Sequence, residues 1–247
     1  MLKKRKTPFL VTILICLSFS WGAYSQYPTV KERIINLPNF DKKPIHYGYF
    51  LGLNQYDFKF EYINNFYKEL NYKDIVVVPK IGFVVGLIGD MRINEYLNLR
   101  FEPGLYYSTR ELKYPEFPEF TKDSDQRREI KSTYIHLPLL IKVSAKRINN
   151  FKPFVMAGIS TDFNLSSNQK NRNDNAGNIF RVTNQNLNYE LGLGFDFYLY
   201  YFKFSPSLRG IFSFQNELIP DSDLTSPWTG KINKMLSRGI AVIITFE

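Results

Sequence analysis

Few residues of this sequence could do acid–base or nucleophilic chemistry. Among its 247 residues are two histidines, His46 and His136, and a single cysteine, Cys16. One cysteine excludes a disulfide framework and almost excludes a zinc cluster of cysteine and histidine ligands. A lipid-modifying barrel enzyme would need a serine placed against one of the histidines, and no serine motif marks such a pair. We therefore interpret both histidines as structural hydrogen-bonding residues and predict no enzyme.

Signals for other ligands are equally weak. The Gly-x-x-x-Gly spacings at 48–52 and 82–86 lack the following lysine and helix of a phosphate loop. The basic stretch 170–172 lacks the interleaved aromatic residues on which nucleic-acid bases stack. We predict no cofactor, no metal, no nucleic acid and no small-molecule substrate.

Charged residues do recur inside otherwise apolar, alternating segments, always at the polar positions of the alternation. Buried charges must pair, because an isolated one costs several kcal/mol. Five positive residues against four negative ones predict a salt-bridged interior; a proton or ion path is the alternative. The predicted network consists of Arg100, Glu102, Lys142, Lys152, Asp162, Glu190, Asp196, Lys203 and Arg209.

The segments that carry these charges alternate with a period of two. Large apolar residues occupy every second position, which sorts side chains onto the two faces of a strand and would smear them around a helix. The pattern predicts eight strands of roughly 12 to 15 residues, longer than the usual five or six and long enough to cross a membrane at a tilt. The runs cover 47–54, 81–88, 97–107, 134–143, 151–163, 187–197, 202–214 and 239–246.

Long and short connections alternate between these runs. The segments 61–75, 111–130, 166–185 and 215–234 are long and polar, whereas 89–95, 144–150 and 199–201 are short. Up-and-down outer-membrane barrels have long loops outside the cell and short periplasmic turns. The sequence thus predicts an all-β, eight-stranded antiparallel transmembrane barrel in the Gram-negative outer membrane, in contact with its lipid, with both termini periplasmic.

Alternation alone does not say which face is inside, since a secreted lipocalin has eight strands with an apolar interior. Glycines decide the orientation here. Glycine gains nothing on a solvated face but suits a narrow interior in which large side chains alternate with small ones. The glycines that fall on the polar face are Gly82, Gly86, Gly104, Gly158, Gly192, Gly194 and Gly239.

The first residues indicate export. A basic start at 3–6 is followed by an apolar stretch at 9–21 and a small-x-small site. We predict a signal peptide over residues 1–25, cleaved between Ser25 and Gln26, a periplasmic lead-in without regular structure over 26–45, and a barrel domain over 46–247. An uncleaved anchor is the alternative.

One loop stands out for its aromatic residues. Tyr114, Phe117 and Phe120 lie on a segment that two prolines stiffen. Exposed aromatic residues on such a loop would suit contact with a partner protein. They would equally suit folding back over the barrel mouth, and the sequence does not separate the two.

Three segments resemble a known family. The similarity to the PorT family covers 43–60 (KPIHYGYFLGLNQYDFKF), 80–112 with its core IGDMRINEYLNLRFEPGLYYSTREL, and 132–165 (STYIHLPLLIKVSAKRINNFKPFVMAGISTDFNL). Leu137–Leu140 (LPLL) marks the broader group of outer-membrane barrels. The strand with His46 and the turn with Lys146 and Arg147 are closer to PorT itself.

The resemblance implies a non-catalytic component of type IX protein secretion, a family called SprT where it supports gliding motility. It implies other secretion-system envelope proteins as partners and no active-site residues. The alternative function is a general small barrel for envelope integrity or adhesion through its long loops. A lipid-modifying enzyme using His136 ranks third.

Overall fold

The computed structural model describes residues 34–63, 74–118, 120, 122–223 and 225–247. The predicted signal peptide at 1–25 and its cleavage site at Ser25 and Gln26 lie outside these residues. All strands belong to one compact unit, residues 35–247. The lead-in includes a 3-10 turn, η2 (Phe40–Lys42), so the expectation of no regular structure there is wrong by that one turn.

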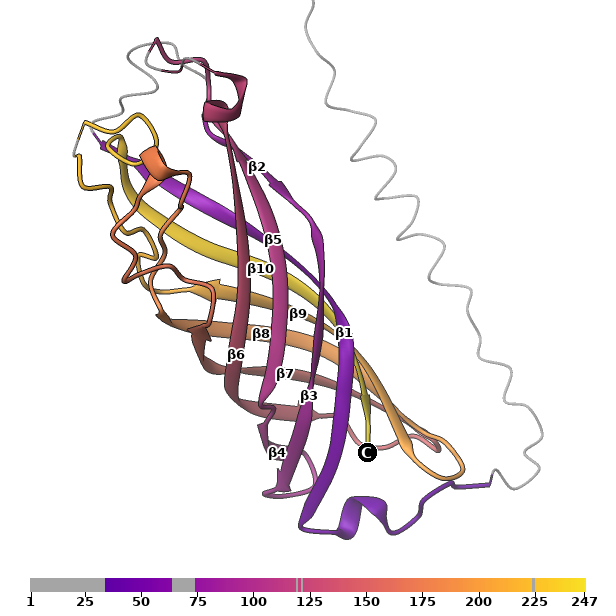
Figure 1. The fold of residues 1–247 in the computed structure, drawn as a ribbon. Helices are drawn as coiled ribbons and strands as arrows, with labels where there is room; N and C mark the ends of the chain where they lie inside the picture. Colours follow the sequence, from indigo (N-terminus) through magenta and orange to yellow (C-terminus); the bar gives the residue numbers. More distant parts are fainter. Residues whose placement is uncertain (1–33, 64–73, 119, 121, 224) are drawn as a thin grey trace, which may run out of the picture. The chain divides into compact units, whose positions relative to one another are not determined.

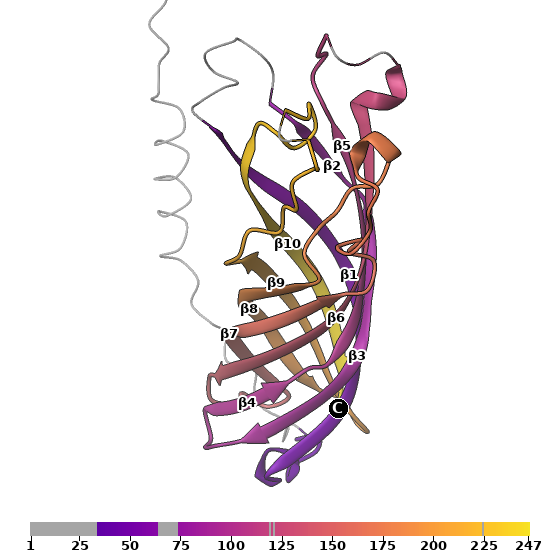
Figure 2. The ribbon, with the colours of Figure 1, turned by 60° about the vertical axis from the view of Figure 1, so that its left-hand side comes forward.

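The described residues form ten strands in one antiparallel sheet (Figures 1 and 2). Two further 3-10 turns, η4 (Asp123–Gln126) and η5 (Asn175–Gly177), lie in the loops. The strands are β1 (Ile45–Tyr62), β2 (Val76–Pro79), β3 (Ile81–Arg92), β4 (Leu97–Phe101), β5 (Gly104–Lys113), β6 (Arg127–Ser144), β7 (Phe151–Asn164), β8 (Gln185–Tyr198), β9 (Lys203–Ser213) and β10 (Ile232–Phe246).

The sheet closes on itself. β1 pairs with β10 on one edge, from Tyr49 opposite Phe246 to Tyr62 opposite Ile232, and with β3 on the other. The ring then runs through β9, β8, β7 and β6, and β6 pairs with both β4 and β5. β4 and β5 share one position in the ring, and so do β2 and β3. The prediction of an eight-stranded up-and-down barrel is therefore confirmed.

At each shared position a local irregularity separates the two strands. Pro103 follows Glu102 and has no backbone N–H to give to the ladder, and β4 ends and β5 begins there in an unchanged register with β6. Between β2 and β3 the pairing with β5 shifts by one residue at Lys80. A one-residue shift reverses which face a side chain occupies, so Val77 faces inward although the next strand carries its odd-numbered residues outward.

The two faces are arranged as predicted. Outward positions hold apolar side chains that no other part of the chain covers; Leu193 is 52% exposed and Val85 is 47% exposed. Inward positions hold the charged residues and the glycines. An exposed apolar belt around a closed barrel matches the hydrocarbon of a bilayer.

The connections alternate as predicted, and β7, β8 and β10 have the predicted 12 to 15 residues, but other strands are longer. β1 and β6 each span 18 residues. The loop assigned to 111–130 is shorter than predicted, because β5 continues to Lys113 and β6 begins at Arg127. Periodicity is hard to detect there, since above the apolar belt the outward positions become charged.

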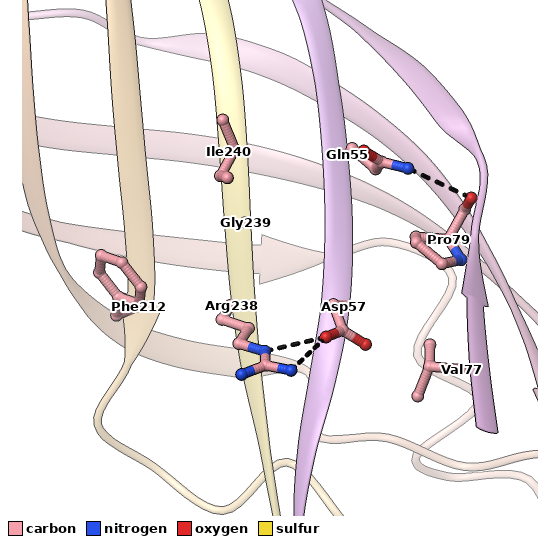
Figure 3. A pocket seen from close by; sticks show the side chains of 8 residues that line it. All are labelled: Gln55, Asp57, Val77, Pro79, Phe212, Arg238, Gly239 and Ile240. Carbon is pink, nitrogen blue, oxygen red and sulfur yellow. Dashed lines mark hydrogen bonds and ion pairs between the residues drawn. The ribbon is translucent and has the colours of Figure 1, made fainter. Parts of the chain in front are cut away.

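The outer wall of β1 and β10 shows this change. Leu51 and Leu53 belong to the belt, whereas Asp57 lies farther along β1 and forms an exposed ion pair with Arg238 of β10, with Nη2 2.6 Å from Oδ2 (Figure 3). β1 and β10 therefore project beyond the belt toward the long loops.

Candidate functional site: an ion-paired lumen closed at both ends

The centre of the barrel is crossed by a chain of ion pairs. Arg209 of β9 places Nη2 2.6 Å from Glu102 and Nη1 3.5 Å from Glu190. A Glu190 oxygen also lies 2.8 Å from His136 Nε2, and His136 Nδ1 contacts Asp162. All five side chains are at most 4% exposed. Each charge is thus paired across strands that are distant in the sequence.

A second group of ion pairs lies toward the short turns. The Arg100 guanidinium contacts Asp90 at 2.9 Å and also Glu247, whose other carboxylate oxygen lies 2.7 Å from Lys203 Nζ. Lys142 forms an ion pair with Asp196 at 2.6 Å. Asp90 lies on the neighbouring strand β3, whereas Glu247 follows β10, two strands farther round the ring, so Arg100 ties β4 to the end of β10.

The structure places all nine predicted network residues inside the barrel, where each is buried. Sequence reasoning missed Asp90 and Glu247, and it predicted His136 as an inward hydrogen-bonding residue without including it in the charge network. The alternation of inward and outward positions along each strand was the signal that could have found them. Asp90 extends the inward even-numbered positions of its strand, and Glu247 extends the inward odd-numbered positions of the last one.

Aromatic rings fill the lumen between the ion pairs. Phe50, fully buried, lies over the neighbouring strands β3 and β5, and a Cβ on Gly86 or Gly104 would lie 2.5 or 2.7 Å from its ring. Tyr56 occupies the same kind of space against Gly239. These glycines are therefore the small partners that large inward side chains require, as the sequence predicted.

The environment of His136 determines its chemistry. Both ring nitrogens lie against carboxylates, Asp162 at Nδ1 and Glu190 at Nε2. Each ring nitrogen therefore already has a carboxylate partner. Neither nitrogen is left to take a proton from a serine, and this geometry does not form a hydrolase triad.

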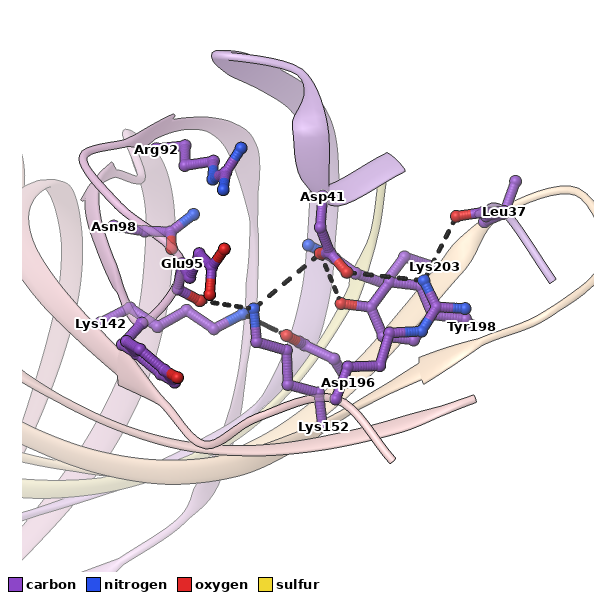
Figure 4. A network of polar contacts seen from close by, with 12 residues as sticks. Leu37, Asp41, Arg92, Glu95, Asn98, Lys142, Lys152, Asp196, Tyr198 and Lys203 are labelled. Carbon is purple, nitrogen blue, oxygen red and sulfur yellow. Dashed lines mark hydrogen bonds and ion pairs between the residues drawn. The ribbon is translucent and has the colours of Figure 1, made fainter. Parts of the chain in front are cut away.

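The lead-in closes the barrel at the short-turn end (Figure 4). Asp41 accepts from the Tyr198 hydroxyl at 2.7 Å and lies 3.9 Å from Lys152. The Phe40 ring stacks on His46 at 4.3 Å and has Lys203 above its face. These contacts place an aromatic ring and a carboxylate directly below the ion-paired lumen.

Arg147, in the turn between β7 and its neighbour β6, holds this closure in position. Its guanidinium donates to the backbone oxygens of Asn36 and Leu37 and lies 3.5 Å from Asp41. It also stacks over the Tyr198 ring at 3.6 Å. The turn at Arg147 therefore holds the described part of the lead-in against the end of the barrel.

The long loops close the opposite end with an apolar cluster, which we call the mouth cluster. It is built from buried residues of four different loops and strand ends, with Phe120 and Trp228 packed against it. The buried members are Phe58, Ile75, Leu112, Tyr114, Phe117, Ile130, Phe180, Val182, Leu218, Ile232 and Met235.

The predicted aromatic loop belongs to this cluster. Tyr114 is 5% exposed and Phe117 is 8% exposed, while Phe120 lies 5.6 Å from the Trp228 ring. The sequence left exposure and folding back over the mouth as equal alternatives for these rings, and Tyr114 and Phe117 are buried. Their geometry is that of the other outcome, folding back over the mouth; contact with a partner through this loop stays a prediction.

Polar contacts link the same loops. Asp221 accepts from the Asn175 side chain at 3.0 Å, and Asn175 in turn accepts from Arg128 at 3.2 Å. Asp174 accepts from the Ser222 and Ala176 backbone N–H groups, each at 3.1 Å. These two hydrogen bonds stabilise its carboxylate, chiefly the one from Ser222, and hold the pKa of Asp174 below its ordinary value.

A closed antiparallel barrel with an apolar outer belt and an ion-paired interior defines the class of outer-membrane β-barrels. The chain belongs to the family of the outer membrane protein beta-barrel domain, whose model matches residues 25–218. It is accordingly a protein of the Gram-negative outer membrane. In the described residues no helix is long and apolar enough to span a membrane.

Three solved structures are similar to the chain. Neisserial surface protein A has 7% identity and a TM-score of 0.42, over 82% of this chain and 98% of its own. The outer membrane protein OprG from Pseudomonas aeruginosa has 14% identity and a TM-score of 0.43, over 82% and 92%. The N-terminal β-barrel domain of OprF from the same organism has 10% identity and a TM-score of 0.32, over 80% and 97%. No curated protein sequence matched.

Proposed function

We propose that this barrel is a non-catalytic component required for type IX protein secretion, and for gliding where that occurs. The resemblance of residues 43–60, 80–112 and 132–165 to the PorT family supports the specific system. The observation that carries the mode of action is the lumen, which ion pairs and rings fill and which is closed at both ends.

A filled lumen limits what the barrel can do. An eight-stranded barrel is just wide enough for its own side chains, and breaking these buried ion pairs would cost several kcal/mol each. Passage of a folded protein through it is therefore not a reasonable function. The barrel would act through its surfaces, by scaffolding or by helping to assemble the translocon with other envelope proteins.

Gene deletion tests the role. In the deletion strain, cargo that carries the type IX signal should accumulate in the periplasm, and the wild-type gene should restore its release. An Arg209→Lys gene should restore it too if folding is preserved, since no transport path is being altered. Normal secretion in the deletion strain would refute the role.

Adhesion or envelope integrity is the second candidate, because the wall of β1 and β10 projects beyond the apolar belt and carries packed loops. Replacing residues 168–181 by a short Gly-Ser linker separates the two functions. Loss of adhesion with secretion intact supports the second candidate, and loss of secretion with adhesion intact supports the first.

A further inference from the structure

The barrel wall is incompletely paired at one place above the apolar belt. β1 and β3 pair from Ile45 to Gln55, and the pairing ends at Gln55 opposite Ile81. Beyond that point β1 pairs with β10 and β2 pairs with β5, but no pairing joins β1 to β2 among the described residues. We call this opening, between 56–62 of β1 and 75–79 of β2, the seam.

A groove of about 550 Å³ lies at the seam (Figure 3). Its walls come from both faces of the sheet. Asp57, Arg238 and Ile240 are outward residues of β1 and β10, whereas Val77 and Pro79 occupy inward positions of β2. The groove therefore spans the outer face of β9, β10 and β1 and reaches β2, whose Val77 also packs against the mouth cluster.

Strand geometry shows which backbone groups face the seam. In an antiparallel strand the N–H and C=O of one residue point to one side and those of the next residue to the other. The Ile63 N–H donates to the Lys231 oxygen beside β10. Every second residue before it, Glu61, Lys59 and Asp57, therefore also points its backbone groups toward β10. It follows that Tyr56, Phe58 and Phe60 face β2.

The same count applies to β2. The Lys80 N–H donates to the Thr109 oxygen, so the backbone groups of Val78 and Val76 also point toward β5. Ile75, Val77 and Pro79 face the seam. The edges of β1 and β2 therefore face each other across the groove without backbone pairing among the described residues.

Three side chains satisfy some of these edge groups. Asp57 Oδ1 accepts from the Phe58 backbone N–H at 2.8 Å, the Tyr62 hydroxyl accepts from Ile75 N–H at 3.1 Å, and the Gln55 amide donates to the Pro79 oxygen at 3.5 Å. Side-chain caps and an edge proline are devices that limit unwanted strand pairing. They leave the backbone groups of Tyr56, Phe60 and Val77 without a strand partner among the described residues.

We propose that the seam binds an extended polypeptide segment, which adds to the barrel wall as a strand between β1 and β2. Main-chain hydrogen bonds supply affinity in this mode, and alternate side chains supply specificity. The occupant would present apolar side chains inward, toward Val77 and the mouth cluster. Outward it would present polar ones beside the Asp57–Arg238 ion pair.

A lipid chain fits this site less well. Unpaired backbone groups are not tolerated in hydrocarbon, and the charged Asp57 and Arg238 mark the seam as lying above the apolar belt. A hydrocarbon chain cannot satisfy the edge groups of Tyr56 and Phe60, whereas a peptide can. The inference does not depend on the secretion role.

Amide hydrogen exchange, resolved by NMR on the barrel purified from membranes in detergent micelles, tests the seam itself. In the free protein the Asp57 and Lys59 amides should exchange slowly and those of Tyr56 and Phe60 at least about tenfold faster, because only the former are in the ladder. Equally slow exchange at all four would show that the chain already closes the seam, and would overturn the proposal.

Binding is then tested with a defined probe, the peptide acetyl-Thr-Val-Thr-Val-Thr-Val-Thr-amide. It should slow exchange at Tyr56, Phe60 and Val77 by about tenfold or more, and the same peptide with N-methylated valines should not. No slowing at millimolar peptide would overturn the proposal. Palmitate that displaces the peptide and binds without slowing exchange would identify a lipid site instead.

A matched pair of variants isolates the backbone contribution. Val77→Pro removes the seam-facing N–H, and Val77→Ala removes side-chain atoms but keeps that N–H. Peptide protection should persist in Val77→Ala and be lost in Val77→Pro, while exchange at Asp57 and Lys59 reports an intact barrel in both. Equal peptide binding by the two variants would overturn strand addition.

Discussion

The two ends of the lumen are filled in chemically opposite ways. Toward the short turns the interior is ionic, with Arg100, Lys142 and Lys203 each in contact with a carboxylate. Toward the long loops it is apolar, with rings and aliphatic side chains from several loops in the mouth cluster. Both solutions fill space, but they depend on different parts of the chain.

The difference follows from what supplies the side chains. In the ionic region the residues sit on strands or, like Glu102 and Glu247, directly follow one. Their positions are fixed by the strand hydrogen bonds, so opposite charges can be aimed at one another. In the mouth cluster the residues sit largely on loops, whose positions follow from the packing itself. We therefore expect damage to the ionic region to affect the whole barrel and damage to the mouth cluster to remain local.

Arg209→Met should have the largest effect. It removes the cation that Glu102 and Glu190 share and leaves each buried carboxylate with one partner, Arg100 or His136. Breaking a buried pair costs about 3–5 kcal/mol. Urea unfolding in detergent, followed by the gel shift of the folded barrel, measures the loss. The exposed Asp57–Arg238 pair is the control, and Arg238→Ala should cost less than about 1 kcal/mol. Equal costs would contradict the ionic assignment.

Phe117→Ala should have the next largest effect, confined to the mouth. Truncating a buried phenylalanine costs about 3 kcal/mol, which should appear as faster proteolysis within residues 114–126 with an unchanged barrel unfolding transition. Glu116→Ala, at an exposed neighbouring position, is the control. A drop in the barrel transition itself would show that the mouth cluster is not an independent unit.

Arg147→Ala should release the lead-in with a smaller effect, about 2 kcal/mol, because it removes charge-assisted hydrogen bonds that are only partly buried. Cleavage near residues 36–43 should become faster. Ion conductance in planar bilayers should stay absent, because the ionic region still fills the lumen. New conductance would mean that the lead-in, rather than the ionic region, closes the barrel.

Acidification should have the smallest effect, and only at the mouth. The hydrogen bond from Ser222 lowers the pKa of Asp174, so the stabilisation is present above the ordinary aspartate pKa of about 3.9 and is lost as pH falls through the lower folded value. NMR titration of the Asp174 carboxyl carbon should give a midpoint below that of an unstructured peptide. Asp174→Asn should remove the dependence from the Ser222 amide shift. A midpoint at or above the peptide value would contradict it.

The sequence alone was sufficient to predict the barrel and which strand faces point inward, because apolar and polar residues alternate between the two faces of a strand. It was sufficient for the charged lumen residues for the same reason. It was insufficient for Asp90 and Glu247, where the alternating run was read as ending too early. Only the coordinates could show that Glu102 serves both Arg100 and Arg209, because ring closure brings these residues together.

Loops were the least predictable part. Tyr114 and Phe117 carry no periodic signal, and whether their rings point outward or pack inward depends on Phe180 and Leu218 from other loops. The seam was also invisible in the sequence. It begins beside the one-residue register shift at Lys80, and the alternation of apolar and polar residues does not reveal such a shift.

Pairing between β1 and β10 has a consequence for biogenesis. These strands are adjacent in the ring but almost two hundred residues apart in the chain, from Tyr49 to Phe246. Until the last hairpin forms, a growing sheet has two unpaired edges and interior charges without their partners. Such a state is prone to aggregate with other chains. Insertion must therefore be nearly all-or-none, and an accessory factor that shields the nascent sheet would have to hold on until the first and last strands meet.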